Sequence, residues 1–100
     1  MRRPLSREEI AFLLAKLPDW DWHENTLTKV FPFRDYMTGV SFANQVAALA
    51  EEKDHHPEMT LAWRSVRVQF TTHDAGHRVT QRDFAMAQRV ETLARNLPSA

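Results

Sequence analysis

The chain has 100 residues, of which 43% are hydrophobic and 26% charged, and its 13 basic and 13 acidic residues give a formal net charge of +0. This length and composition are typical of one globular domain. The balanced charge argues against nucleic acid or an anionic membrane as the main partner, because such partners select basic chains. With no cysteine, disulfides and thiolate zinc sites are excluded. No apolar run has the length of a signal peptide or membrane span, so we expect a soluble cytoplasmic protein.

A first helix is predicted close to the start of the chain. Ser6 and Glu9 have the spacing of a capping box, in which each side chain satisfies a backbone amide of the first turn. Apolar residues then recur at helical spacing, at Ile10, Leu13, Leu14 and Leu17. We expect Pro18 to end this helix.

Two strands are predicted next. Trp20 and Trp22 alternate with acidic residues, and residues 23–25 have the composition of a turn. The apolar residues Leu27, Phe31 and Phe33 then share one phase of a period of two. This pattern predicts a β-hairpin, and Pro32 indicates that its second strand lies at an edge of the sheet.

The central segment changes to a helical period from Asp35 onward. Its apolar stripe is Met37, Val40, Ala43, Val46, Ala47 and Ala50. Pro57 disfavours helical geometry at the residue before it, so the helix should end near Asp54 or His55. His55 and His56 are therefore predicted to lie at the helix exit.

The last third predicts one or two strands and a closing helix. Leu61 and Trp63 alternate in one phase, whereas Val66, Val68 and Phe70 alternate in the other. This odd offset requires either a bulge or a tight turn. Residues 74–78 read as a loop, and Thr80 with Asp83 opens a helix whose apolar residues include Ala87, Val90, Ala94 and Leu97. The order of elements favours an α+β fold with helices on one face of the sheet.

Five histidines are present, and their predicted positions differ. His23 and His77 lie in predicted turns, where a solvated polar residue is expected. His55 and His56 flank a helix end, where an imidazolium can act simply as a cap for the helix dipole. His73 ends a strand at a similar boundary. Three boundary histidines thus admit both a structural and a functional interpretation.

Acidic residues accompany these three histidines. Glu51 lies four residues before His55 and would share its face if the helix persisted, so it could orient that imidazole. Asp54 and Asp83 add two carboxylates, although an aspartate in a first helical turn also suits the helix dipole. Histidines with nearby acids suit general acid and base catalysis. Zinc is disfavoured, because neighbouring histidines point apart and the helical spacing of a zinc site is absent.

The whole set of motifs resembles the signature of the pterin-4a-carbinolamine dehydratases, also called 4a-hydroxytetrahydrobiopterin dehydratases. The residues that carry this resemblance are Glu51, His55-His56-Pro57, Trp63, Thr72-His73, Thr80 and Asp83. It extends to residues 17–20 and 31–35 and so covers nearly the whole chain. The sequence differs from the commonest pattern at Met59, at Trp63 and in the loop that contains His77-Arg78-Val79.

The resemblance implies a single domain over residues 1–100 with a four-stranded antiparallel sheet and three helices on one face, in the order α-ββ-α-ββ-α. That fold favours a boundary between two strands near Arg64 and Ser65. The resemblance also implies a homodimer or homotetramer, and a functional link to an aromatic amino-acid hydroxylase.

The implied reaction removes water from 4a-hydroxytetrahydrobiopterin to give quinonoid dihydropterin, in tetrahydrobiopterin recycling, without a metal or organic cofactor. Our hypothesis is that His55 and His73 exchange protons at C4a and N5, that His56 positions the ring, and that Glu51 and Asp83 orient the histidines. The predicted substrate-binding residues are Trp20, Asp54, Pro57, Thr71 and Thr72. For Trp20, a place in the core is the alternative.

A second function remains open at this point. A chain with this fold could serve as a binding or dimerisation module that acts through a protein partner. The complete set of histidines and acids favours catalysis over this alternative.

Overall fold

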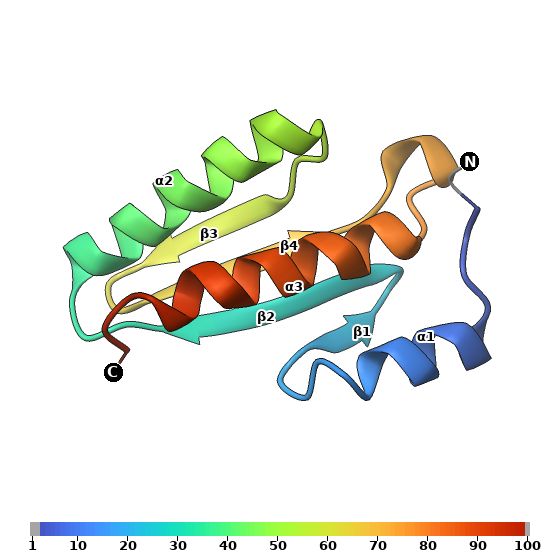
Figure 1. Cartoon of the computed structure of the whole chain (residues 1–100), viewed down its shortest axis with the longest axis horizontal. Coiled ribbons are helices and arrows are strands. Elements are labelled where there is room, and N and C mark those ends of the chain that lie inside the picture. Colours follow the sequence, from blue (N-terminus) through green and yellow to red (C-terminus); the bar gives the residue numbers. More distant parts are fainter. Residues whose placement is uncertain (1–2, 100) are drawn as a thin grey trace.

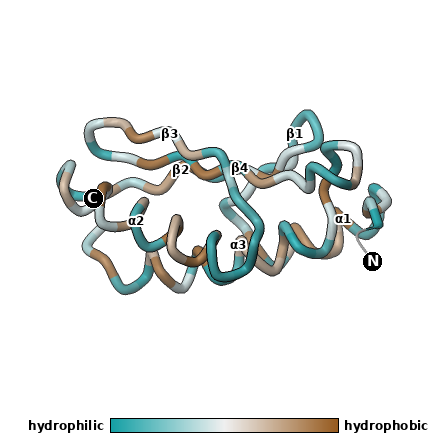
Figure 2. The backbone as a smooth tube through the Cα atoms, turned by 90° about the horizontal axis from the view of Figure 1, so that it is seen from above, coloured by the Kyte–Doolittle hydropathy of each residue, from teal (hydrophilic) through white to brown (hydrophobic). Residues whose placement is uncertain are grey.

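The computed structural model describes residues 3–99. Its elements are α1 (Arg7–Leu14), β1 (Asp21–His23), β2 (Thr26–Pro32), α2 (Tyr36–Lys53), β3 (Glu58–Ala62), β4 (Ser65–Phe70), a short 3-10 turn η1 (His73–Ala75) and α3 (Gln81–Arg95). The four strands pair antiparallel in the order β1-β2-β4-β3. Helices α2 and α3 lie across the sheet and α1 lies beside β1, all on one face (Figures 1 and 2). The α+β prediction is confirmed.

Helix α1 begins as predicted and ends earlier. Ser6 is the N-cap, and both hydrogen bonds of the capping box with Glu9 are present. The helix ends at Leu14, where the hydrogen bonds change from the α-helical to the 3-10 pattern. The amides of Lys16 and Leu17 donate to carbonyls three residues back, at 3.0 and 2.9 Å. Pro18 therefore lies beyond the end of the helix.

The first hairpin turns at Glu24 and Asn25, whose φ angles of 47° and 63° are both in the left-handed region. Two such residues give the turn whose twist matches antiparallel strands. The prediction of an edge position for Pro32 is wrong for the strand, since β2 lies between β1 and β4. However, β1 pairs only with residues 26–28. Pro32 thus lies where β2 has a strand on one side alone, and its missing N–H is tolerated.

The buried face of α2 is rotated from the predicted stripe. The buried residues are Gly39, Phe42, Val46, Leu49 and Ala50, whereas Met37 is 69% exposed. Phe42 determines this face, because its ring packs between those of Phe31 and Phe33, with both centroid distances 4.9 Å. A large aromatic side chain contributes more buried area than the alanines of the predicted stripe.

The phase break after Trp63 is a tight turn. Ala62 pairs with Ser65, so Trp63 and Arg64 form the connection between β3 and β4. The boundary between two strands is thereby confirmed, and Val66, Val68 and Phe70 all point into the core. Within residues 3–99, no helix is long and apolar enough to cross a membrane.

Candidate functional site

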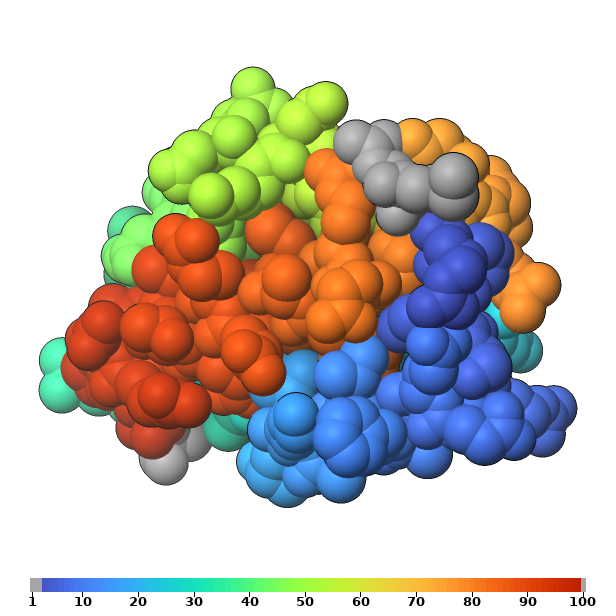
Figure 3. Space-filling view, turned by 45° about the vertical axis from the view of Figure 1, so that its right-hand side comes forward, coloured from blue at the N-terminus to red at the C-terminus, as the bar shows by residue number. Residues whose placement is uncertain are grey.

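The end of α2 and the start of α3 are tied together at one end of the molecule. Asp54 closes α2 in the left-handed conformation, with φ 51° and ψ 45°, which turns the chain off the helix axis before His55. One guanidinium nitrogen of Arg82 donates to the carbonyl oxygens of Lys53 and Asp54, at 3.0 and 2.9 Å. The last helix therefore holds the exit of α2 in place. Figure 3 shows α3 lying between the end of α2 and α1 on this face.

His55 belongs to a buried hydrogen-bond network that is centred on Asp83. His55 is 6% exposed and Asp83 is fully buried. Oδ1 of Asp83 lies 2.6 Å from Nε2 of His55, and Oδ2 accepts from the backbone amide of Thr80 and the hydroxyl of Thr72, each at 2.8 Å. Three donors thus converge on one carboxylate, and this satisfies it without water.

This network fixes the hydrogen positions around His55. An ionised carboxylate only accepts hydrogen bonds, so Nε2 of His55 carries the hydrogen that faces Asp83. The Thr72 hydroxyl donates to Asp83, and therefore the Thr80 hydroxyl, 2.7 Å away, donates to Thr72. Nδ1 is the nitrogen of His55 that remains for another group. The ring itself stacks on Phe70, with centroids 5.9 Å apart and planes 6° from parallel.

His56 forms a second, exposed pair. Its Nε2 lies 2.5 Å from Oε2 of Glu51, and the two side chains are 54% and 78% exposed. The sequence predicted His55 as the partner of Glu51. That pairing is wrong, because α2 ends at Lys53 and the left-handed Asp54 breaks the helical spacing on which it depended. Each of the two adjacent histidines consequently has a carboxylate of its own.

His73 forms a third pair, with another histidine. It starts η1, directly after Thr72, and its Nδ1 lies 3.0 Å from Nδ1 of His77. The two rings are perpendicular, at 89°, with centroids 4.8 Å apart. The sequence-based interpretation of His77 as only a solvated turn residue missed this contact.

The residues predicted to bind substrate fall into two groups. Asp54 and Pro57 lie at the exit of α2, beside the histidine pair. Thr72 is buried and its hydroxyl serves Asp83, while the Thr71 hydroxyl donates to the carbonyl of Asn25 at 2.9 Å. Neither threonine side chain is free to bind a ligand without rearrangement, so a contact from this segment would use its backbone.

Trp20 lies in the hydrophobic core. It is 2% exposed, packs against the rings of Phe31 and Phe70, and donates from Nε1 to Glu91 at 2.9 Å. This burial supports the core alternative for Trp20 over a wall of a binding site. Phe70 contacts both Trp20 and the ring of His55, so Trp20 packs behind the aromatic ring on which His55 stacks.

Arg82 is a site residue that sequence reasoning missed. It borders a depression of 390 Å³ between the end of α2 and α3, which His55, Met86 and Arg89 also line. No local pattern marks it, because its hydrogen bonds reach carbonyls 28 and 29 residues away. Its position directly before Asp83, in the first turn of α3, is the signal that could have drawn attention to it.

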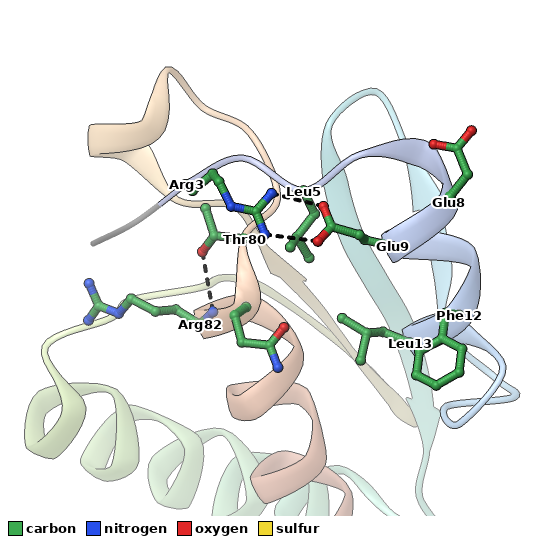
Figure 4. A pocket seen from close by; sticks show the side chains of 9 residues that line it. Arg3, Leu5, Glu8, Glu9, Phe12, Leu13, Thr80 and Arg82 are labelled. Carbon is green, nitrogen blue, oxygen red and sulfur yellow. Dashed lines mark hydrogen bonds and ion pairs between the residues drawn. The ribbon is translucent and has the colours of Figure 1, made fainter.

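A separate depression of 540 Å³ lies between α1 and the start of α3. Figure 4 shows its rim, where Arg3 reaches across to Glu9 and Leu5 lies near Thr80. It contains none of the histidines. Among residues 3–99, no three histidine, aspartate or glutamate side chains converge so that they could hold a metal ion.

Comparison with known proteins gives one consistent family. Residues 3–93 match the family described as Pterin 4 alpha carbinolamine dehydratase. A curated relative from Natronomonas pharaonis, which carries the provisional name pterin-4-alpha-carbinolamine dehydratase, is 48% identical over 80% of this chain and 87% of its own. A relative of the same provisional name from Rhizorhabdus wittichii is 43% identical over 91% of this chain and 95% of its own.

Two solved structures are also similar. A protein from Brucella melitensis, described as a transcriptional coactivator/pterin dehydratase, has a TM-score of 0.86 and 33% identity, over 92% of this chain and 99% of its own. A pterin dehydratase-like protein described as a RuBisCO assembly factor in the alpha-carboxysome has a TM-score of 0.61 and 28% identity, over 75% of this chain and 86% of its own.

Proposed function

Because this chain belongs to the pterin 4 alpha carbinolamine dehydratase family, we propose that it removes water from 4a-hydroxytetrahydrobiopterin to give quinonoid dihydropterin. The observation that carries the proposal is that two adjacent imidazoles leave α2 together, each on its own carboxylate: His55 on Asp83 and His56 on Glu51. A helix end that needed only a cap would not require either partner.

The chemistry asks for one proton donor and one proton acceptor. The bond between C4a and the hydroxyl oxygen breaks as that oxygen receives a proton, and the hydrogen on N5 leaves as a proton while the C4a–N5 double bond forms. No electrons are gained or lost overall, so the reaction needs no redox cofactor. Imidazoles can donate and accept protons near neutral pH.

We assign the proton transfers to His56 and His73, because both side chains are exposed. The sequence-based hypothesis gave His55 that role and His56 the positioning of the ring. The burial of His55 favours the reverse, since only Nδ1 of its ring remains for a substrate while Nε2 faces Asp83. In this division of roles, His55 orients the pterin and Glu51 orients His56.

The product of this reaction is a substrate for a reductase that restores the tetrahydropterin. The proposed physiological place is therefore tetrahydrobiopterin recycling, downstream of an aromatic amino-acid hydroxylase that forms the 4a-hydroxy compound. The backbone near Asp54 and Thr72 would contact the amide edge of the pterin.

The test is a stopped-flow assay with synthetic 4a-hydroxytetrahydropterin. The wild-type protein should accelerate the loss of the 4a-hydroxy absorbance, and His56→Ala should reduce kcat by about 10² to 10⁴-fold, the usual contribution of a general acid or base. His23→Ala is the matched control, because His23 is also an exposed histidine and lies on β1, outside the site. Equal rates for wild type and His56→Ala would refute the assignment.

The second candidate function is association with a protein partner. It is favoured by the descriptions of the two similar structures, as a transcriptional coactivator and as an assembly factor. On this chain, Phe12, Met37 and Trp63 are 66%, 69% and 72% exposed, and such side chains are often buried at interfaces. The stopped-flow assay separates the two functions, because a pure binding module would leave the spontaneous rate unchanged.

We also propose that the chain forms a homodimer. Strand β3 is one of the two outer strands of the sheet, with no strand on its far side among residues 3–99. An unpaired edge favours the addition of another strand, and a second copy could supply it.

A further inference from the structure

We propose that His77 is a positioning residue that holds His73 and lets that imidazole act either as proton donor or as proton acceptor. This inference rests on the proposed dehydratase function and deepens it. It begins from the contact between the two Nδ1 atoms, which lie 3.0 Å apart within the loop that joins β4 to α3.

The contact between the two Nδ1 atoms requires one donor and one acceptor. At a neutral imidazole one nitrogen carries the hydrogen and the other accepts. If Nδ1 of His73 donates to His77, then Nε2 of His73 is a free base. If Nδ1 of His73 accepts, then its Nε2 carries a hydrogen. His73 can give that hydrogen to a substrate as the Nδ1 hydrogen of His77 moves onto Nδ1 of His73 and Nε2 of the exposed His77 takes a proton from water, so that both rings end neutral. The tautomer of the pair thus sets what His73 offers.

The other two histidines lack this freedom. The carboxylates of Asp83 and Glu51 only accept hydrogen bonds, so each fixes a hydrogen on Nε2 of its histidine. His77 is the one partner in the set that can donate as well as accept. The reaction delivers a proton to oxygen and removes one from nitrogen, and the second transfer reverses the first. Nε2 of His73 takes the proton from nitrogen, the Nδ1 hydrogen of His73 moves to Nδ1 of His77, and Nε2 of His77 gives a proton to water, which restores the starting tautomer.

The loop backbone is built to keep the two rings together. Gly76 and His77 are consecutive residues in the left-handed region, with φ 73° and 57°. Glycine adopts this region freely, whereas for histidine it is uncommon and costs free energy. The loop is closed by the backbone amide of Thr72, which donates to the carbonyl of Arg78 at 3.0 Å. This places a strained histidine directly against His73, and strained residues of this kind cluster at functional sites.

The test combines two substitutions with NMR and kinetics. His77→Gly removes the imidazole and also relieves the left-handed backbone, so the variant should fold at least as well as wild type. His77→Asn keeps a side chain that can donate or accept and tolerates the same backbone. His23→Ala is the matched control, because His23 is exposed and contacts Glu24 rather than a site residue.

In long-range ¹H–¹⁵N spectra, His77→Gly should move the Nδ1 signal of His73 to that of a free imidazole and leave the signals of His55 and His56 in place. In the carbinolamine assay, kcat should fall about tenfold with KM little changed, as expected for a misplaced catalytic group. His77→Asn should recover part of that loss, and His23→Ala should match wild type in both measurements.

An unchanged His73 signal in His77→Gly, or equal kcat values for His77→Gly and wild type, would overturn the proposal. Equal losses in His77→Gly and His77→Asn would also overturn it, because they would show that hydrogen bonding at this position is not what matters. The NMR measurement needs no turnover. A wild-type protein without dehydratase activity would therefore refute the proposed function separately, while the spectra still decide whether His77 holds His73.

Discussion

The two carboxylates that hold the adjacent histidines lie in very different surroundings. Asp83 is fully buried and accepts three hydrogen bonds, from His55, Thr72 and the amide of Thr80. Glu51 is 78% exposed on its side chain and has water as an alternative partner. Loss of a buried partner leaves other buried groups unsatisfied, whereas loss of an exposed one does not. Asp83 therefore couples the site to stability, and Glu51 is expected to act on the site alone.

Replacement of Asp83 tests this coupling at the level of a single residue. We expect Asp83→Ala to lower the free energy of unfolding by about 3 kcal/mol, because it leaves the His55 imidazole and the Thr80 amide buried without their partner. It also removes one half of the capping box of α3. Asp83→Asn keeps the shape and one acceptor oxygen, so its loss should be about 1 kcal/mol. Urea unfolding measures both values.

Glu51→Gln is the control for that experiment. It removes a charge beside His56 at an exposed position. The free energy of unfolding of this variant should therefore lie within about 0.5 kcal/mol of the wild-type value. Equal stability of wild type and Asp83→Ala would show that the buried network does not contribute to the folded state.

At the scale of the elements, the start of α1 depends on ionised Glu9. Arg3 donates two hydrogen bonds to its carboxylate, at 2.9 and 2.8 Å (Figure 4). The Ser6 amide donates another at 2.9 Å. The Arg3 hydrogen bonds, followed by that of the Ser6 amide, lower the pKa of Glu9 from 4.5 to about 2. The carboxylate thus joins the segment before α1 to its first turn.

This lowered pKa predicts how α1 responds to acid. Because the pKa of Glu9 is lower in the folded chain than in the unfolded chain, its contribution to stability is fully present above pH 4.5 and is lost as the pH falls toward 2. An NMR titration of the Glu9 carboxyl carbon should give a midpoint near pH 2. In parallel, the stability difference between wild type and Glu9→Gln should shrink over this pH range. A midpoint near 4.5 would show that Arg3 and the Ser6 amide do not hold the Glu9 carboxylate in solution.

At the scale of the whole molecule, the fold was predictable where local chemistry decides the structure. The capping residues Ser6 and Thr80 and the proline after His56 marked element boundaries that the structure confirms. The central position of β2 was not predictable from Pro32. The missing N–H of a proline excludes a neighbouring strand only on one side of that residue, and not along the whole strand. The face of α2 depended on Phe42, whose ring neighbours lie outside the helix: Phe31 on β2 and Phe33 directly after it.

The sequence identified the three boundary histidines and their acids as candidates, but not the pairs that they form, nor Arg82 and His77. Glu51 contacts His56 rather than His55 because a single left-handed residue, Asp54, ends the regular spacing between them. The contact of His73 with His77 depends on two consecutive left-handed residues, which periodicity does not reveal. Pairings that depend on where the chain departs from a regular element need its coordinates.

The open edge of β3 predicts how two copies would associate. Antiparallel pairing about a two-fold axis at Thr60, the middle residue of Glu58–Ala62, would place Met59 beside Leu61 of the second copy and Glu58 beside Ala62. This register pairs apolar side chains, of which Leu61 is 40% exposed in the single chain, and keeps the two glutamates apart. It would extend the sheet of each copy across the interface.

Thr60→Lys tests this arrangement. Because residue 60 lies at the two-fold axis, the substitution would place the lysines of the two copies directly opposite one another. Like charges in that position destabilise strand pairing. Light scattering on an eluted peak should give wild type twice the 11.7 kDa mass of one chain, and Thr60→Lys the mass of one chain. Thr60→Val, which keeps a β-branched side chain without charge, should remain a dimer. A dimer in all three proteins would mean that a surface other than the β3 edge joins the copies.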